Sequence, residues 1–272
     1  MTARSGTSAS VYDKPLLYDI AFSYRDYPAE VDALCAWFAR VSGTGRQPRS
    51  FLELAAGPAD HAIELARRGA SATALDLAPA MCDYARQKSE LLGAPVDSAC
   101  ADMIDFELPA RFELAALMIN SVAHLYDLDA LVQHLQAVAR HLEPHGVYVL
   151  EVQHPADFVG RGPRPAGTSQ PWTVERFGLE VRTRWGTPDD PYDPLRQIFE
   201  AHVELQVRGP EGEETIHERV PMRDWTRTEL EAGVRLSGAF ELAEIHGALE
   251  ADAPFDSSPE SWRMVLVLRR KA

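Results

Sequence analysis

The chain of 272 residues has few cysteines, no long apolar run and a shortage of basic side chains. Its three cysteines, Cys35, Cys82 and Cys100, are far apart, with no Cys-x-x-Cys pair and no histidine at ligand spacing. We therefore expect neither a zinc site nor a disulfide framework. The amino-terminal residues lack the apolar segment of a secretion signal, and no apolar run approaches membrane length. These absences predict a cytoplasmic protein without a membrane partner.

The charge balance also restricts the partners. Acidic side chains outnumber basic ones by 41 to 27, and the formal net charge is −14. A surface of this sign repels phosphate backbones, so we expect no nucleic-acid partner. A neutral or cationic small-molecule substrate fits the charge better. Apolar residues make up 46% of the chain, and the length suits one large α/β domain or one domain with an insertion.

Short apolar segments alternate with helical patterns between residues 48 and 154. Five of these segments are typical of buried strands: SFLEL, SATALDL, VDSACAD, FELAALMIN and VYVLEV. The helix predicted within DLDALVQHLQAVARHLEPHG is expected to end at Pro144 and Gly146. Repeated strand–helix order with apolar strands predicts a parallel sheet that is covered on both faces and has right-handed crossovers.

The flanking segments follow other patterns. Residues 1–12 are small and polar and are expected to be frayed, and a helix is predicted over 28–41. Residues 155–171 are rich in Pro and Gly and predict a loop or lid, and 172–222 predict an antiparallel meander. We therefore expect three parts: N-terminal cap helices (1–47), an α/β core (48–154 with 226–272), and a lid loop with an antiparallel β insertion (155–225).

The stretch FLELAAGPADHAIEL, residues 51–65, predicts a strand, a tight loop and a helix start. Ligands in open α/β sheets bind outside the carboxyl ends of the strands, where the first loop must approach them closely. Ala55, Ala56, Gly57 and Ala59 are small enough for this approach. Alanine tolerates positive φ poorly, however, and only one glycine is present. A plain turn therefore explains this segment as well as a cofactor loop does.

Three acids stand at the ends of three successive predicted strands: Glu53, Asp76 and Asp102. Asp76 follows Glu53 by 23 positions, where an acid can accept hydrogen bonds from ribose hydroxyls. Asp102 can accept from an adenine amino group, and Met103 can pack on the ring. Taken singly, each acid could instead be a helix N-cap or a solvated loop residue. Together they favour a nucleotide-type cofactor.

Four motifs resemble those of class I S-adenosylmethionine-dependent methyltransferases: LELAAGPAD, ALDLAPAMCDYARQK, ACADMIDFEL and the block from FELAALMINSVAHLYD to VYVLEV. The resemblance covers roughly residues 48–154. It implies a Rossmann-like, doubly wound, mostly parallel seven-stranded sheet and S-adenosylmethionine as cofactor. An NAD-type dehydrogenase, the alternative enzyme, would normally keep a fuller GxGxxG and would leave NSVAHLYD unexplained. The cofactor residues that the resemblance implies are Glu53, Ala55, Gly57, Asp76, Leu77, Met81, Asp102, Met103 and Asn120.

The segment LLYDIAFSYRDYPAEVDALCAWF is similar to the one before the core of small-molecule methyltransferases, including sugar-amine N-methyltransferases. This resemblance implies that Tyr18 covers the cofactor and that Tyr24 and Arg25 reach its carboxylate. It also implies that the antiparallel insertion forms a wall of the substrate pocket or a dimer surface, so a homodimer is one expectation.

The expected reaction is methyl transfer to a small-molecule acceptor, with an amine as first choice and a hydroxyl or carboxylate oxygen as the alternative. No metal is expected, because a sulfonium methyl is already activated. His124 is the candidate base, since an imidazole suits proton removal near neutrality. Family members commonly have glycine where Ala55 and Ala59 stand, which leaves a non-catalytic binding or assembly protein as another alternative. Further substrate contacts are predicted at Gln153, His154, Arg182 and Trp185.

Overall fold

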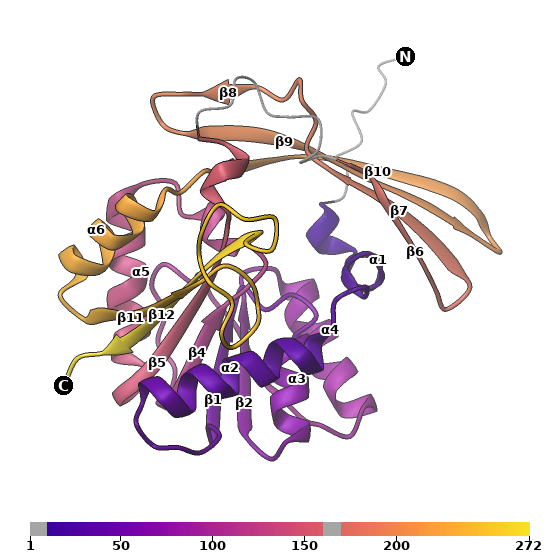
Figure 1. Cartoon of the computed structure of the whole chain (residues 1–272). Coiled ribbons are helices and arrows are strands. Elements are labelled where there is room, and N and C mark those ends of the chain that lie inside the picture. The colour runs from indigo at the N-terminus through magenta and orange to yellow at the C-terminus, as the bar shows by residue number, and fades with distance from the viewer. Residues whose placement is uncertain (1–9, 160–169) are drawn as a thin grey trace.

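The computed structural model describes residues 10–159 and 170–272, which form two sheets and the helices around them (Figure 1). The seven-stranded sheet has the order β11-β12-β5-β4-β1-β2-β3. Its strands are β1 (Ser50–Leu54), β2 (Ser71–Asp76), β3 (Asp97–Cys100), β4 (Phe112–Leu117), β5 (Leu142–Gln153), β11 (Phe240–His246) and β12 (Arg263–Arg270). The first five strands pair in parallel, and β12 runs antiparallel to both of its neighbours. The predicted fold class, a mostly parallel seven-stranded sheet, is confirmed.

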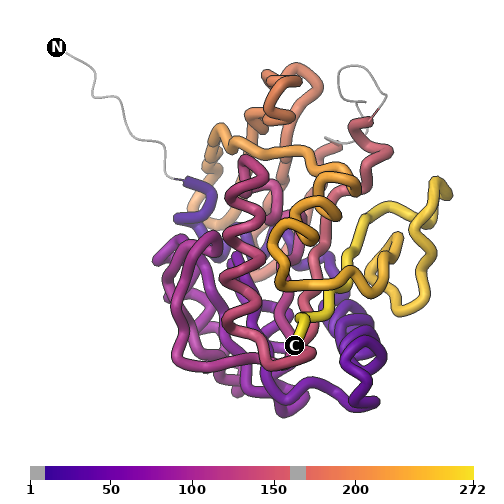
Figure 2. The backbone as a smooth tube through the Cα atoms, turned by 90° about the vertical axis from the view of Figure 1, so that its left-hand side faces the viewer, coloured from indigo at the N-terminus to yellow at the C-terminus, as the bar shows by residue number. Residues whose placement is uncertain are grey.

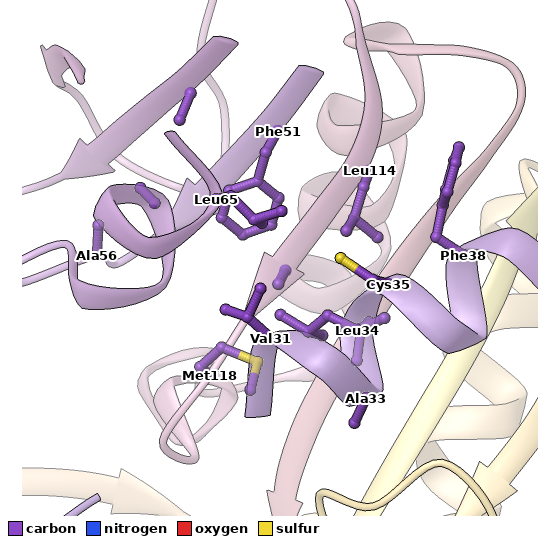
Figure 3. Packing of buried hydrophobic residues seen from close by; sticks show 14 of the residues in the cluster. Val31, Ala33, Leu34, Cys35, Phe38, Phe51, Ala56, Leu65, Leu114 and Met118 are labelled. Carbon is purple, nitrogen blue, oxygen red and sulfur yellow. The ribbon is translucent and has the colours of Figure 1, made fainter. Parts of the chain in front are cut away.

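Helices cover both faces of this sheet and also lie between it and the insertion. They are α1 (Pro15–Phe22), α2 (Tyr27–Val41), α3 (Asp60–Arg67), α4 (Pro79–Leu91), α5 (Leu128–Arg140) and α6 (Arg227–Ser237), with short 3-10 helices η1 (Val11–Asp13), η2 (Ser121–His124) and η3 (Pro155–Asp157). One buried cluster packs α2 and α3 against Phe51 and Leu114 on β1 and β4 (Figure 3). A second cluster packs α5 and α6 against the opposite face. Alternating side chains of each strand thus enter different cores.

The insertion forms a second, antiparallel sheet that lies over η1 and α1 (Figures 1 and 2). Its strands are β6 (Trp172–Arg176), β7 (Leu179–Trp185), β8 (Tyr192–Asp193), β9 (Ile198–Gly209) and β10 (Gly212–Arg223). The inner face is apolar: Ala201, Val203 and Leu205 of β9 are buried against the cap. Residues 202, 204 and 206 alternate with them and form the outer face.

Two local expectations are wrong. Helix α5 ends at Arg140, and β5 begins at Leu142, so Pro144 and Gly146 lie within the strand. The pairing of β4 with β5 shifts there, because four residues of β5 bulge out while His145 takes a positive φ of 63°. The amino terminus differs as well. Ser10 caps η1 and Val11 is fully buried, whereas residues 1–9 lie outside the described part.

The predicted lid, 155–171, is described only at its ends, because residues 160–169 lie outside the described part. Residues 155–157 form η3. Among the described helices, none is both long and apolar enough to cross a membrane.

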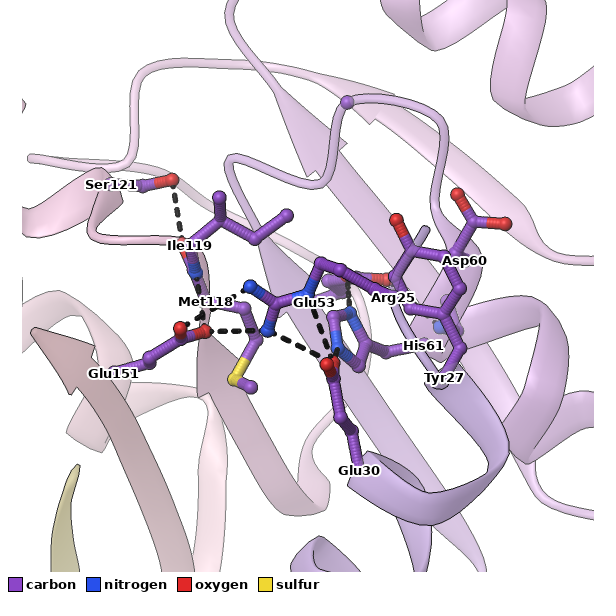
Figure 4. A network of polar contacts seen from close by, with 12 residues as sticks. Arg25, Tyr27, Glu30, Glu53, Asp60, His61, Met118, Ile119, Ser121 and Glu151 are labelled. Atoms are coloured by element: carbon purple, nitrogen blue, oxygen red, sulfur yellow. Dashed lines mark hydrogen bonds and ion pairs between the residues drawn. The ribbon is translucent and has the colours of Figure 1, made fainter. Parts of the chain in front are cut away.

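A buried network of charges joins the cap to the sheet (Figure 4). The Arg25 guanidinium lies 2.9 Å from Glu30 of α2 and 3.0 Å from Glu151 of β5. Arg263 lies 3.0 Å from the other oxygen of Glu151. Burial opposes the ionisation of Glu151, but the charges of Arg25 and Arg263 hold its pKa at about 2.

His61 of α3 continues this network toward β1. Its ring nitrogens lie 2.7 Å from Glu53 and 2.8 Å from Glu30. Burial disfavours a charged imidazole, but the attraction of Glu53 and the hydrogen bonds to both carboxylates raise the pKa of His61 to about 9. At neutral pH the network therefore holds three carboxylates and three cations, which leaves no net buried charge.

The raised pKa of His61 makes stability depend on pH. The folded state holds this proton more tightly than the unfolded chain does, so the contribution is complete below pH 6.5 and lost as pH rises through about 9. We expect the unfolding free energy of the wild type to fall relative to His61→Gln between pH 6.5 and 9.5, by at most about 3 kcal/mol. Urea unfolding at several pH values measures this difference. The exposed His145→Gln serves as control, and wild-type and His61→Gln curves that stay parallel over this range would contradict the assignment.

Candidate active site

A cavity of about 740 Å³ lies beside the residues that follow β1, β2, β3 and β4. The cap and the inner face of the insertion form its other walls, through Tyr12, Tyr18, Trp185 and Met222. Its volume falls within the range of about 300–1,000 Å³ that is typical of small-ligand pockets. The position at the carboxyl ends of parallel strands is the one expected for a ligand in this type of sheet.

The loop after β1 has the backbone of a glycine-rich loop although it contains one glycine. Ala55, Gly57 and Ala59 have positive φ values of 46°, 50° and 62°. For alanine this conformation costs roughly 1–2 kcal/mol per residue. The loop is nevertheless held in place, because the amide of Ala56 donates to the carbonyl of Leu75 (3.0 Å) and that of Ala59 to Ala56 (2.8 Å). The loop therefore has the backbone conformation that a glycine-rich loop would adopt.

Asp76, at the end of β2, connects this loop to the next one. Its carboxylate accepts from the amide of Gly57 (2.7 Å) and from that of Ala78 (2.9 Å), and it lines the cavity. Burial raises the pKa of Asp76, although these backbone hydrogen bonds oppose the rise. Each carboxylate oxygen keeps a further lone pair, so Asp76 can accept from ligand hydroxyls in addition.

Apolar side chains lie along the neighbouring wall of the cavity. Leu77 and Met81 follow β2, and Leu77 is 68% exposed at the cavity wall. Asp102 and Met103 follow β3, and the Asp102 carboxylate accepts from the amide of Ile104 (2.8 Å). This combination of flat apolar surface and an acid suits an adenine ring with its amino group.

Met103 is fixed from behind by a buried histidine. Nδ1 of His134 donates to the carbonyl of Met103 (2.7 Å), and Nε2 lies 2.6 Å from the Tyr148 hydroxyl. Burial lowers the pKa of His134 to about 4, so the imidazole is neutral and the Tyr148 hydroxyl donates to Nε2. The predicted adenine wall thus rests on α5 and β5.

The turn after β4 is strained and supported by β5. Ile119 and Asn120 have φ values of 54° and 58°, which are unfavourable above all for a β-branched side chain. The amide of Ile119 donates to Glu151 (2.7 Å), and the Asn120 side chain accepts from the amide of Gln153 (3.0 Å). Asn120 and Gln153 line the cavity. Such strain is typical of functional sites where the surroundings fix the conformation.

His124 ends η2 directly after this turn and lines the cavity. Its Nε2 lies 3.3 Å from the hydroxyl of Tyr12 in η1. Burial lowers the pKa of His124 and raises that of Tyr12, so both groups are neutral near pH 7. The buried Trp225 indole donates to the carbonyls of Val122 (3.1 Å) and Leu125 (3.2 Å), which fixes the turn that carries His124.

Two of the three predicted cap residues lie at the cavity. Tyr18 lies against Gly57, where an added Cβ would be 3.7 Å from its ring, and Tyr24 is 60% exposed at the cavity wall. Arg25 does not lie at the cavity, contrary to the expectation that it reaches the cofactor carboxylate. Its side chain is 4% exposed, pairs with Glu30 and Glu151, and is not among the cavity residues.

Other predicted residues also lie elsewhere. The Glu53 carboxylate is buried behind the loop, where it accepts from the amide of Ala62 (2.8 Å) and contacts His61. His154 does not line the cavity, because Nδ1 accepts from the amide of Ala156 and Nε2 donates to the carbonyl of Asp256. Arg182 is exposed on the outer face of β7, whereas Trp185 of the same strand lines the cavity.

Sequence reasoning missed Tyr12 and Glu218. Tyr12 belongs to the segment expected to be frayed, and Glu218 lies on the inner face of β10, between Ile216 and Val220. The Glu218 carboxylate accepts from the amide of Val11 (2.7 Å) and from the Ser10 hydroxyl (3.0 Å). Alternation along β10 could have identified Glu218. It lies two positions from each of the apolar residues Ile216 and Val220, and therefore on the same face of the strand.

These side chains fit S-adenosylmethionine. The half-buried carboxylate of Asp76 lines the cavity beside a loop of small residues, as a ribose requires. Met81, Met103 and the exposed Leu77 supply apolar contact for a base. Asn120 would lie toward the methionine end.

Known proteins that are similar to this chain are methyltransferases. Residues 51–146 match a family described as a methyltransferase domain. The chain is 25% identical over 264 residues to the cypemycin N-terminal methyltransferase of a Streptomyces species, covering 96% of this chain and 98% of that protein. It is 29% identical over 137 residues to a dTDP-3-amino-3,4,6-trideoxy-alpha-D-glucopyranose N,N-dimethyltransferase of Streptomyces venezuelae. This second match spans 50% of the chain and 55% of the relative.

The fold is shared with solved structures. One is the amino pentose methyltransferase of Micromonospora echinaspora, whose structure contains bound SAM. It superposes with a TM-score of 0.70 at 21% identity and covers 99% of this chain and 100% of its own.

Asp76 is the residue on which cofactor binding should depend most. We expect Asp76→Asn to weaken S-adenosylmethionine binding by roughly 30- to 100-fold, because the amide loses one acceptor and places a donor against backbone N–H groups. Calorimetric titration measures the change. The exposed Asp97→Asn at the other end of the sheet is the matched control. A dissociation constant within twofold of the wild type for Asp76→Asn would remove Asp76 from the site.

Proposed function

We propose that this S-adenosylmethionine-dependent methyltransferase methylates the nitrogen of an amine on a small-molecule acceptor. The observation that carries the proposal is the neutral His124–Tyr12 pair on the cavity wall. The pair lines the same cavity as Asp76, Asp102 and their neighbours, which are the proposed cofactor residues. The acceptor would therefore lie between the core and the insertion.

His124 is suited to the proton that an amine must lose. S-adenosylmethionine supplies a methyl group already activated on a sulfonium, so the protein has to align the acceptor and accept a proton. An amine near neutral pH arrives largely as ammonium, whose lone pair is not available for attack. Because burial lowers the pKa of His124, its imidazole is unprotonated at pH 7 and can take this proton. The Tyr12 hydroxyl, 3.3 Å from Nε2, orients the ring.

Negative charge around the acceptor end favours a cation. Glu218 lines the cavity and lies near enough to Tyr12 to contribute, after burial, to its raised pKa. Asp13 of η1 lines the same end of the cavity. The two carboxylates would attract an ammonium group and repel a carboxylate acceptor.

The relatives' names support nitrogen as the accepting atom. One is an N-terminal methyltransferase and the other an N,N-dimethyltransferase of an amino sugar nucleotide. The acceptor panel therefore has two members, a dTDP-linked amino sugar and a short peptide with a free amino terminus. Each is paired with an analogue in which hydroxyl replaces the amine. Methylation of hydroxyl analogues alone would overturn the proposal.

His124→Ala should slow turnover of the preferred amine by roughly 100-fold or more, the usual contribution of a general base. The wild-type rate should fall only below the lowered pKa of His124, as pH drops and the imidazole becomes protonated, and the variant should lack this acid limb. Steady-state kinetics from pH 5 to 8 measure both effects.

Cofactor affinity separates a chemical role of His124 from a structural one. S-adenosylmethionine should bind His124→Ala as it binds the wild type, and the exposed His145→Ala should retain full activity. Unchanged turnover in His124→Ala would exclude it as the base.

A further inference from the structure

The outer face of the insertion carries a group of side chains that methyl transfer does not use. His202 and Glu204 lie on β9, and His217 lies on β10. Their ligand atoms all lie within 4.8 Å of one another, and these three residues are the one such group of metal-capable side chains among residues 10–159 and 170–272. They alternate with the apolar residues that face the cap, so they lie on the side of the sheet away from the cavity.

The strand register brings the three side chains together. Glu204 and His217 are directly paired across β9 and β10, and His202 precedes Glu204 by two positions on the same face. The Nδ1 atom of His217 lies 3.4 Å from the Glu204 carboxylate, and the two imidazole centroids are 5.5 Å apart. Zinc binds nitrogen and oxygen ligands at about 2.0–2.2 Å, which places neighbouring tetrahedral ligands roughly 3.3 Å apart. The His217 Nδ1 atom and the Glu204 carboxylate are already at this spacing.

Neighbouring groups hold the Glu204 side chain and the backbone of His202 in place. The Gln206 amide donates to one oxygen of Glu204 (2.8 Å) and leaves the other directed at His217. The backbone amide of His202 donates to the buried Asp190 (2.9 Å). Contacts such as the one between Gln206 and Glu204 orient metal ligands in known sites. β9 and β10 are paired over twelve registered positions, so the ligands also stand on a continuous ladder.

Two arginines place positive charge beside these three residues, which opposes the binding of a cation. Arg184 of β7 is paired with Glu204 on its other side, and Arg219 of β10 is paired with His202. The Arg219 guanidinium is directed at Asp190, at 3.7 Å. These charges disfavour hard cations held by charge alone. Two imidazole nitrogens instead favour a transition-metal ion.

We propose that His202, Glu204 and His217 form a binding site for a divalent transition-metal ion of the zinc type. Three protein ligands leave at least one coordination position for water or an exogenous donor. The site is separate from the methyl-transfer cavity and does not depend on the proposed function. It revises the expectation of a chain without a metal site, which rested on the spacing of the cysteines and on the chemistry of methyl transfer.

Zinc titration of the tag-free, chelator-treated full-length chain tests the proposal. We expect one Zn²⁺ per chain with micromolar affinity by calorimetry. We also expect Co²⁺ to give the visible absorption of a low-coordinate site and Mg²⁺ to give no binding. Each of His202→Ala, Glu204→Gln and His217→Ala should weaken Zn²⁺ binding at least tenfold, whereas the exposed His145→Ala should bind as the wild type does.

Metal-free unfolding midpoints show whether each variant is folded, and at least one folded variant is expected because the cluster lies on the outer face. Absence of one-site binding in the wild type would overturn the proposal. So would wild-type Zn²⁺ affinity in the folded variants, or loss of binding in His145→Ala.

Discussion

The buried carboxylate of Glu151 is the group on which the site depends most. It joins three parts of the chain: Arg25 of the cap, Arg263 of β12, and the amide of Ile119 in the turn before His124. A buried charge without its partners costs several kcal/mol, so none of these contacts can be lost alone at low cost. The cap, the sheet and the strained turn therefore hold one another in place. The same network reaches β1 through Glu30, His61 and Glu53, behind the cofactor loop.

The strained stretches of the site are held by hydrogen bonds to neighbouring strand ends. Ala55 and Ala59 occupy a glycine conformation, and Ile119 and Asn120 occupy another left-handed stretch. Each stretch is hydrogen-bonded to the end of a neighbouring strand. The first is bonded to Leu75 and Asp76, and the second to Glu151 and Gln153. Positions that are fixed before a ligand arrives lower the entropic cost of binding it. The same bonds allow a loop with a single glycine to keep this backbone conformation.

Much of the fold and part of the site could be predicted from the sequence. Strand–helix alternation specifies a parallel sheet, because apolar strands joined by helical crossovers have few other packings. The carboxyl ends of parallel strands meet at one edge, so Asp76 and Asp102 could be placed at the cavity by position alone, whereas Asn120 came from the family resemblance. His124 followed from its position in the same way as the two acids. For these residues, the strand that each one follows determines where its side chain lies.

The residues that depended on long-range partners could not be predicted in this way. Arg25 and His154 carry functional groups of the expected type, but carboxylates and backbone carbonyls distant in sequence bind them. In the insertion, alternation separates two faces without saying which one meets the cap, and only packing assigned Trp185 to the cavity and Arg182 to solvent. The sequence by itself determined the sheet and the acids at its edge, because both follow from local periodicity. The tertiary structure alone decided the partner of each buried charge and the orientation of the insertion, because these depend on contacts between segments far apart in the chain.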